Sequence, residues 1–454
     1  MGDPEASDAY LDVESRLLAR WPETRLEPSL VRIAALCDLM GQPQRAYPVV
    51  HLTGTNGKTS TARMIDTLLR GLGLRTGRST SPHVESMTER ISIDGSPLSR
   101  ERFVEVYDEV EPYAAIVDNS GPFPVSFFEF ITAMSFAAFA DAPVDAGIIE
   151  VGMGGVWDAT NVADAAVAVV TPIAVDHSSY LGDMPAEIAV EKAGIIKPGS
   201  FAILGQQPLE AAEVLLAHAA QVGATVAREG LEFGVTSRTP GLGGQVVTIQ
   251  GLEATYEDVF LPLHGAHQAN NAACAIAAVE AFAGGTGLDG GLDIEAVREA
   301  MEQVDSPGRL EVVRRSPTVV IDAAHNPAGA IATAEAVQEA FSFSPLIGVL
   351  GVMADKDVDG LLDAFEPVFA TVVCTQNSTP RAMRAESLGE LARGVFGSDR
   401  VIVAPRLGDA VVQAIGLAEE GEGGGLGGGG VLITGSVITA GEARSLLWRP
   451  GLTG

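Results

Sequence analysis

The sequence predicts an α/β protein of two domains, each built around a mostly parallel β-sheet. Its 454 residues are too many for one ordinary hydrophobic core. Nearly continuous apolar runs within 146–155 and 165–177 are separated by helical patterns, which is typical of parallel strands that helices cover on both faces. A second group of such runs begins near residue 310, and we place the domain boundary around Asp305–Gly308.

The first domain is predicted to combine helices and buried strands with a small antiparallel addition. In chain order its elements are helices up to residue 47 that prolines interrupt, a strand at 49–52, a helix at 59–72, strands within 146–155 and 165–177, short alternating strands at 229–263, and a helix at 268–283. The stretch "GGTGLDGGLD" that follows is interpreted as a loop.

The second domain is predicted to be a further α/β unit. In chain order it contains a strand within 317–325, a helix at 328–341, a strand within 346–353, another helix, and strands at 371–376 and 430–436. The stretch "EEGEGGGLGGGG" at 419–430 is interpreted as a surface linker that carries no chemistry.

Composition narrows the class of partner. The net charge of −30 argues against nucleic acid, because phosphate binding needs a basic surface. The longest apolar stretches are about half the length that spans a bilayer, and the start "MGDPEASDAY" lacks the apolar segment of a secretory signal. The three cysteines form no CxxC pair, which indicates free thiols in a reducing compartment. We expect a cytoplasmic monomer that binds small molecules, and neither nucleic acid nor membrane.

The stretch "GTNGKTS" is a candidate phosphate-binding loop between a predicted strand and a predicted helix. The strict spacing GxxxxGK[ST] fails, because Leu52 stands where its first glycine would be. The shorter loop still supplies backbone N–H groups, a helix N-terminus and a lysine, which together cradle a triphosphate; the alternative is a plain glycine turn. The candidate nucleotide-binding residues are Gly54, Thr55, Asn56, Gly57, Lys58, Thr59 and Ser60.

Three polar residues at a turn and at two strand ends form a candidate Mg²⁺ site. Ser81 precedes a proline, while Glu150 and His177 end two successive predicted strands. A hydroxyl, a carboxylate and an imidazole can hold Mg²⁺ when water and phosphate oxygens complete its coordination. His177 alone is better explained as a capping or core residue, but Glu150 on a separate strand end favours the metal.

Eleven motifs in order resemble the folylpolyglutamate synthase/dihydrofolate synthase family, which is related to the Mur peptide ligases. They are GTNGKTS, SPH-x-ES-x-TERI, FFEF, EVGMGG-x-WDATN, DHSSYLG, EKAGIIKPG, HQ-x-x-NA, SPGRLE, DAAHNP, GVMADKD and ITGS. The resemblance extends from about residue 25 to 447. It implies a P-loop NTPase-like domain of the Mur ligase central type at 1–306, which binds ATP and a pterin, and a Rossmann-like domain at 307–454, which binds glutamate.

The resemblance also implies a reaction. Members of this family use ATP to convert the carboxylate of a pterin-bearing acid to an acyl phosphate, which the amine of L-glutamate then displaces. The acid would be dihydropteroate, a folate with its polyglutamate tail, or both. The cofactors implied are ATP and two Mg²⁺ ions, and the family also admits a monovalent cation.

Site residues carry over from the family motif by motif. The catalytic group would be Lys58, Glu150, His177 and Lys192. The Mg²⁺ ligands would be Ser81, Glu150, His177 and, after carbamylation by CO₂, Lys192. Further ATP contacts would be Asn271, Arg309 and Asp322, and glutamate contacts would be His325 and Ser436. The pterin-binding residues would be Ser126, Phe127, Phe128, Glu129, Trp157, Asp158 and Ala159.

Several of these assignments have plainer alternatives. Lys192 could be a surface lysine paired with Glu191, the aromatic residues could pack in the core, and His325 could cap the helix that follows it. Two motifs also depart from the family pattern: Val156 stands where an arginine is common, and GSVITAGE lacks the aromatic residue of GSLYxxGE, which puts the glutamate pocket near Ser436 in doubt. The competing functions are a Mur-type ligase for another acid, and a P-loop ATPase that forms no bond.

Overall fold

The computed structural model describes residues 4–22, 27–285, 291–420 and 428–447. The predicted loop at 284–293 and the predicted linker at 419–430 fall partly outside these ranges. The chain divides into two compact units, which are treated separately. Unit 1 comprises Met1–Ser237, Val247–Phe260 and Ala269–Val304, and unit 2 comprises Arg238–Val246, Leu261–Gln268 and Asp305–Gly454.

Unit 1 is built on an eight-stranded sheet in the order β4-β3-β2-β5-β1-β6-β7-β8. The strands are β1 Val49–Thr53, β2 Thr76–Ser79, β3 Ile91–Ile93, β4 Ser96–Pro97, β5 Ala146–Glu150, β6 Ala165–Val170, β7 Phe201–Leu204 and β8 Thr225–Arg228. All neighbours from β2 to β8 are parallel, and β3 and β4 add an antiparallel edge. The residues that follow β1, β5 and β6 therefore lie together at the carboxyl ends of these parallel strands, where ligands bind in such folds.

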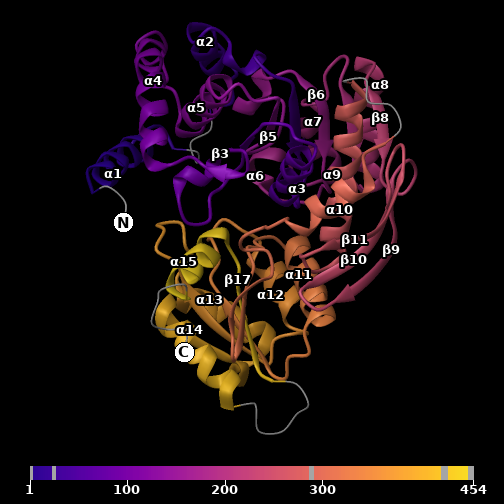
Figure 1. Ribbon diagram of the computed structural model, residues 1–454. Helices are drawn as coiled ribbons and strands as arrows, with labels where there is room; N and C mark the ends of the chain where they lie inside the picture. The colour runs from indigo at the N-terminus through magenta and orange to yellow at the C-terminus, as the bar shows by residue number, and fades with distance from the viewer. Residues whose placement is uncertain (1–3, 23–26, 286–290, 421–427, 448–454) are drawn as a thin grey trace. The chain divides into compact units, whose positions relative to one another are not determined.

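The described helices of the first 302 residues surround this sheet (Figure 1). They are α1 Pro4–Leu18, α2 Val31–Leu39, α3 Lys58–Gly71, α4 Arg100–Asp118, α5 Phe127–Asp141, α6 Ser178–Leu181, α7 Pro185–Ala193, α8 Leu209–Val222, α9 Ala266–Gly285 and α10 Ile294–Glu302, with 3₁₀ turns η1 Pro43–Arg45, η2 Met87–Arg90 and η3 Ala159–Val162. Val49 and Ile149 share a buried cluster with α1, α2, α4 and α5, so these helices bury one face of the sheet centre. Helix α3 packs on β1, β2 and β5, and α10 packs on α3.

The small addition is a three-stranded sheet in the order β11-β10-β9. Its strands are β9 Gly234–Gly241, β10 Gly244–Gln250 and β11 Thr255–Leu261. Connections this short can join only antiparallel neighbours, which confirms the predicted antiparallel addition.

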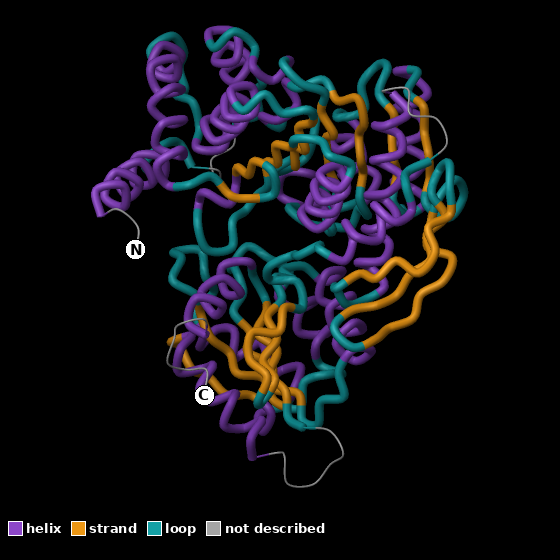
Figure 2. Tube along the Cα trace, in the orientation of Figure 1, coloured by secondary structure: helices purple, strands orange, loops and turns teal. Residues whose placement is uncertain are grey.

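Unit 2 contains a six-stranded sheet in the order β12-β13-β17-β14-β15-β16, with helices on both faces (Figure 2). The strands are β12 Glu311–Arg315, β13 Thr318–Ile321, β14 Leu346–Leu350, β15 Thr371–Gln376, β16 Val401–Arg406 and β17 Gly430–Thr434, and the helices are α11 Pro327–Ala340, α12 Val358–Phe365, α13 Ala385–Phe396, α14 Leu407–Glu420 and α15 Val437–Leu447, with the 3₁₀ turn η4 Ser398–Arg400. Alternate strand residues bury opposite faces: Val320 packs with α11, α12 and α13, whereas Val319 and Ile321 pack with α14 and α15.

The predicted α/β class, the strand before the glycine loop and the helix after it are confirmed. Two strands of unit 2 were not predicted. Strand β12 is an antiparallel edge strand with charged and largely accessible residues, so it lacks the continuous apolar run that identifies a buried strand. Strand β16 begins with a short apolar run at 401–404, which was missed, and it ends in a proline and an arginine. No helix in the described ranges is long and apolar enough to span a membrane.

A buried ion pair joins α3 to β2. Asp66 is fully buried and accepts hydrogen bonds from Thr76 Oγ1 at 2.5 Å and Arg78 Nη1 at 2.8 Å. We expect Asp66→Ala to lower the free energy of unfolding by about 3–5 kcal/mol, because the guanidinium of Arg78 loses its buried carboxylate partner. Chemical denaturation followed by circular dichroism measures the change.

The control is Asp12→Ala, which removes an exposed pair with Arg16 and should cost less than about 1 kcal/mol. Equal losses in the two variants would contradict this account of the buried pair.

Candidate active site

The glycine loop connects β1 to α3 and depends on two glycines. Gly54 has φ +144°, and a Cβ there would overlap the side chain of Thr171. Gly57 has φ +88°, and a Cβ there would lie 2.5 Å from Oδ1 of Asn271 in α9. Thr55 fixes the loop to the segment after β6, because its Oγ1 donates to the carbonyl of Ala174 at 2.8 Å. The structure therefore brings the predicted ATP residue Asn271 against the loop.

Two lysines donate to the same carbonyl at the start of this loop. Lys58 Nζ lies 3.0 Å from Gly54 O and 3.1 Å from Thr55 O, and Lys192 Nζ lies 2.9 Å from Gly54 O. Only 4% of Lys192 is exposed, so it is not the surface lysine of the plainer alternative. Burial, and then the charge of Lys58, lower the pKa of Lys192 to about 7, which makes a neutral amine accessible near neutral pH.

Oxygen atoms gather around Glu150 at the end of β5. The Oγ1 of Thr59 lies 3.0 Å from both carboxylate oxygens, and the backbone N–H of Ser81 donates to Oε2 at 3.3 Å. The structure thus brings together the predicted ligands Ser81 and Glu150 with Thr59 of the loop. A carboxylate and hydroxyls are the hard oxygen donors that Mg²⁺ prefers, so these residues fit the metal.

His177 lies at the start of α6, with φ +54° and its Nε2 3.8 Å from Oδ2 of Asp176. The negative charge of Asp176 raises the pKa of Lys192, against the larger effects of burial and of Lys58. Among the described residues there is no group of three or more His, Cys, Asp or Glu side chains that could hold a metal. Of the predicted Mg²⁺ ligands, only Glu150 and His177 are of these residue types.

The predicted aromatic residues divide into two groups. A Cβ on Gly152 would lie 2.6 Å from the Phe128 ring, and a Cβ on Gly154 would lie 3.2 Å from the Trp157 ring, so both rings flank the loop after β5. Phe127 instead lies in the hydrophobic core, with the guanidinium of Arg90 5.0 Å from its ring centroid. The loop after β5 therefore has two partly accessible rings beside it.

The loop after β5 is held by a buried chain of hydrogen bonds. Thr160 Oγ1 donates to Asp158 Oδ1 at 2.5 Å and therefore accepts from His51 Nε2, which lies 2.8 Å away. Asp158 Oδ2 accepts from the N–H of Met153 at 2.9 Å, and Thr53 Oγ1 donates to Gly154 O at 2.9 Å. Sequence analysis missed His51, although a histidine inside an apolar strand was a visible signal.

Of the other predicted pterin residues, Asp158, Ala159 and Glu129 are buried and Ser126 is half-buried. Asp158 is 3% exposed and its carboxylate is hydrogen-bonded within the loop after β5. Ala159 lies in the buried cluster that contains Val49 and Ile149. Ser126 and Glu129 bind each other at the start of α5, as the residues of a capping box do.

In unit 2, Asp322 is buried and organises its own surroundings. Its carboxylate accepts from the backbone N–H groups of Leu310 and Ala324 at 3.0 and 2.9 Å, and from Thr333 Oγ1 at 2.9 Å. Arg309 precedes Leu310, and its Nη1 donates to Gly308 O at 3.2 Å. The structure thus places the predicted residues Asp322 and Arg309 next to each other.

The two residues that were predicted to contact the substrate glutamate make hydrogen bonds within unit 2. His325 Nδ1 lies 3.0 Å from Ala323 O. Ser436 is 2% exposed and begins α15, where its Oγ accepts from Thr439 N at 3.0 Å and from Asn377 Nδ2 at 3.2 Å. Asn377, which follows β15, was missed although a polar residue at a strand end was the signal that identified Glu150.

His51 makes the stability of unit 1 depend on pH. Burial lowers its pKa to about 3, because a second proton would go to Nδ1, a buried atom with no hydrogen-bond partner in the described ranges. Below pH 6.5, His51 binds a proton in the unfolded chain but not in the folded chain. The contribution of His51 to the free energy of unfolding is therefore complete above pH 6.5 and is lost as the pH falls toward 3. We expect this residue to remove about 2 kcal/mol of stability between pH 7.5 and 5, measured by denaturant unfolding.

His51→Gln is the control, because glutamine can donate to Thr160 but does not titrate. As the pH falls, the titration of His51 should lower the free energy of unfolding of wild type but not that of the variant, so the advantage of wild type over the variant should shrink. A difference that stays constant from pH 7.5 to 5 would show that His51 does not titrate in the way described.

Comparison with known proteins places the chain in a family. Residues 127–279 match the Mur ligase middle domain, and residues 308–437 match the Mur ligase glutamate ligase domain. A Mycobacterium tuberculosis dihydrofolate synthase/folylpolyglutamate synthase is 52% identical over 466 residues, which cover 98% of this chain and 95% of that protein. A Lacticaseibacillus casei folylpolyglutamate synthase is 33% identical, over 92% of this chain and 94% of that protein.

Solved structures agree. Mycobacterium tuberculosis folylpolyglutamate synthase complexed with ADP and AMPPCP has a TM-score of 0.93 at 52% identity, covering 98% of this chain and 99% of that one. Escherichia coli FolC in complex with DHPP and ADP has a TM-score of 0.84 at 28% identity, covering 98% and 99%. This chain therefore belongs to the dihydrofolate synthase/folylpolyglutamate synthase family of Mur ligases.

Proposed function

We propose that this chain is an ATP-dependent ligase that adds L-glutamate to dihydropteroate, to the polyglutamate tail of a folate, or to both. Family membership supports the class of reaction. The observation that carries the proposal is the loop itself: Lys58 and Lys192 converge on Gly54 O, and the oxygen cluster of Glu150 adjoins the same loop through Thr59. This arrangement suits a triphosphate and a metal at one strand edge.

The reaction has two steps. A carboxylate oxygen of the pterin-bearing acid attacks the γ-phosphorus of ATP, the bond to the β–γ bridging oxygen breaks, and ADP leaves. The amine of glutamate then attacks the acyl carbon, phosphate leaves, and the nitrogen loses a proton to give the amide. Both reactants of the first step are anions, so the protein must supply positive charge where they meet. We assign this role to Lys58, whose Nζ lies 3.0 Å from Gly54 O in the loop.

We assign ATP binding to residues 54–60 with Asn271, Arg309 and Asp322, and we assign the pterin to the loop after β5. Phe128 and Trp157 are the rings that lie at this loop, and a flat heterocycle can stack on such rings. The remaining predicted residues shape the same region, four from buried positions and Ser126 from a half-buried one: Asp158, Ala159, Glu129, Phe127 and Ser126. We assign glutamate to the region of His325 and Ser436.

We assign Mg²⁺ to Ser81, Glu150 and His177, and a second ion to Lys192 in carbamylated form. When bound, the metal would neutralise phosphate oxygens that Lys58 alone cannot balance. Ser81 and Glu150 hold each other through a hydrogen bond, so this chain orients its carboxylate before any ion arrives.

The burial of Lys192 beside Lys58 supports its modification by CO₂. We expect alkylative trapping in the presence of bicarbonate, followed by peptide mass spectrometry, to give a carboxylated Lys192. The chain has only four lysines, and Lys197, which donates to Asn161 O and Ala163 O at 2.7 Å, should remain unmodified as the internal control. Trapping without any mass increase on Lys192 would contradict this assignment.

We also propose that the protein works in the cytoplasm. Cys37, Cys274 and Cys374 are free and buried, which suits a reducing compartment. The proposed partners are small molecules: ATP, L-glutamate and the pterin-bearing acid.

The test of the function is product formation. Purified protein with Mg-ATP, L-glutamate and either dihydropteroate or tetrahydrofolate should give products heavier by one or more glutamates, detected by mass spectrometry. Lys58→Ala should lose at least about 100-fold in kcat/KM while keeping the circular dichroism spectrum, because it removes a charge that acts on the transferring phosphate.

Each negative result identifies an alternative. Glutamate-dependent phosphate release with another acid but with neither pterin would indicate a different Mur-type ligase. ATP hydrolysis that needs no amine would indicate an ATPase that forms no bond. Near-normal turnover by Lys58→Ala would refute the role given to the loop.

A further inference from the structure

The first turn of α5 is fixed by a reciprocal pair of hydrogen bonds. Ser126 Oγ accepts from the N–H of Glu129 at 3.2 Å, and Glu129 Oε2 accepts from the N–H of Ser126 at 2.8 Å. This capping box determines where the helix begins. It therefore also determines where Phe128, one residue before Glu129, places its ring against the loop after β5.

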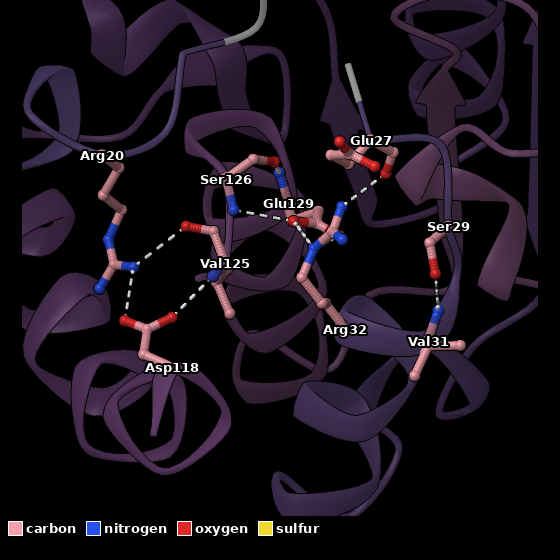
Figure 3. Close-up of polar contacts among 9 residues, drawn as sticks. All are labelled: Arg20, Glu27, Ser29, Val31, Arg32, Asp118, Val125, Ser126 and Glu129. Atoms are coloured by element: carbon pink, nitrogen blue, oxygen red, sulfur yellow. Dashed lines mark hydrogen bonds and ion pairs between the residues drawn. The ribbon is translucent and has the colours of Figure 1, made fainter. Parts of the chain in front are cut away.

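Arg32 of α2 closes this capping box from outside the helix (Figure 3). Its Nε lies 3.0 Å from both carboxylate oxygens of Glu129, and its Nη2 donates to the carbonyl of Glu27 at 2.9 Å. The side chain of Glu129 is 5% exposed and that of Arg32 is 17% exposed, so water screens this pair little. One guanidinium thus joins the segment before α2 to the first turn of α5.

A capping box does not need an arginine, as a second one in the same unit shows. Glu89 of η2 forms the same box with Ser86, and its carboxylate accepts from the backbone N–H groups of Val84 and Glu85 at 2.8 and 3.0 Å. The carboxylate of Glu129 receives Arg32 instead. Arg32 is therefore not needed to form the capping box. Its additional contribution is the hydrogen bond to Glu27 O, which connects the box to the segment before α2.

The chain just before Ser126 is anchored independently. Asp118 Oδ1 accepts from the N–H of Val125 at 2.6 Å, and Arg20 Nη1 donates to Asp118 Oδ2 at 3.1 Å and to Val125 O at 3.3 Å. The guanidinium of Arg20 also lies 4.3 Å from the ring centroid of Phe130. Because these contacts hold α5 in the fold without Arg32, removing Arg32 should loosen its first turn and leave the rest of the helix in place.

We propose that Arg32 is a positioning residue for the pterin-bearing substrate: it locks the first turn of α5 to segment 27–31 and so fixes the ring of Phe128 beside the loop after β5. This inference rests on the proposed function, because it takes the pterin to bind at that loop. Arginine suits the task, since its planar fork reaches two acceptors at once, whereas a lysine has one nitrogen at the end of a flexible chain.

The experiment compares Arg32→Met and Arg32→Lys with wild type. Arg32→Met should raise the KM for dihydropteroate, and its dissociation constant by calorimetry, about tenfold, while the KM for ATP changes by less than about twofold. Arg32→Lys should fall between wild type and Arg32→Met. The difference between the two substrates is the informative readout. A purely structural role would lower the melting temperature and change the KM for dihydropteroate and the KM for ATP by the same factor.

Arg400→Met is the matched control. Like Arg32, Arg400 bonds a carboxylate, that of Glu366, and backbone carbonyls, here those of Glu366, Phe369 and Ala370. It lies in unit 2 and is not one of the proposed binding residues. Its loss should leave both KM values within about twofold of wild type.

Should Arg32→Met fail to fold, Glu129→Gln takes its place. Glutamine preserves the capping box but not the ion pair, and the same rise for dihydropteroate is expected. An unchanged dihydropteroate KM in the folded variant, or equal rises for dihydropteroate and ATP, would overturn the inference. Loss of product by wild type would instead refute the proposed function, and calorimetry on wild type and Arg32→Met would still compare their binding of dihydropteroate.

Discussion

The carbonyl of Gly54 receives two lysine side chains at once, and much of the candidate site follows from this contact. Lys58 and Lys192 are both drawn to one weak acceptor, at 3.0 and 2.9 Å, in a position where water is largely excluded from Lys192. Two cations so placed repel each other unless one is neutral or an anion arrives. The chain has only four lysines and a net charge of −30, and two of the four lysines meet at this carbonyl.

Strand β1 supports both halves of this region. It ends in the glycine loop, and two of its side chains reach across to the loop after β5, with Thr53 bound to Gly154 and His51 bound to Thr160. Both side chains are completely buried. The glycine loop and the loop that carries Trp157 are thus both fixed to the five residues of β1, so the strand sets the separation between them.

Much of this could be predicted from local sequence. Glycines, a lysine and a helix pattern identify the first loop, and polar residues at strand ends identify Glu150, because in both cases the signal lies within a few adjacent residues. Contacts between distant residues left no such signal. Lys192 reaches a carbonyl 138 residues away, and Arg32 reaches a carboxylate 97 residues away. Sequence analysis also could not decide between Phe127 and Phe128, since adjacent helical residues face different directions and only packing shows which one enters the core. Nor could it show that Asp322 and Ser436 are saturated by their own unit.

Several arginines of this chain are paired with carboxylates inside the protein, which affects the charge that an approaching ligand meets. Arg20, Arg32 and Arg78 all pair with carboxylates at largely buried positions, so their charges contribute little to the outer surface. The chain carries a net charge of −30, so an approaching anion meets a protein of the same sign. ATP and an anionic acid must cross this repulsive field before they reach the lysines, and dissolved ions weaken such a field over distances of about 10 Å. We therefore expect moderate salt to speed the encounter of this protein with its anionic substrates, whereas salt slows the encounter when enzyme and ligand attract each other.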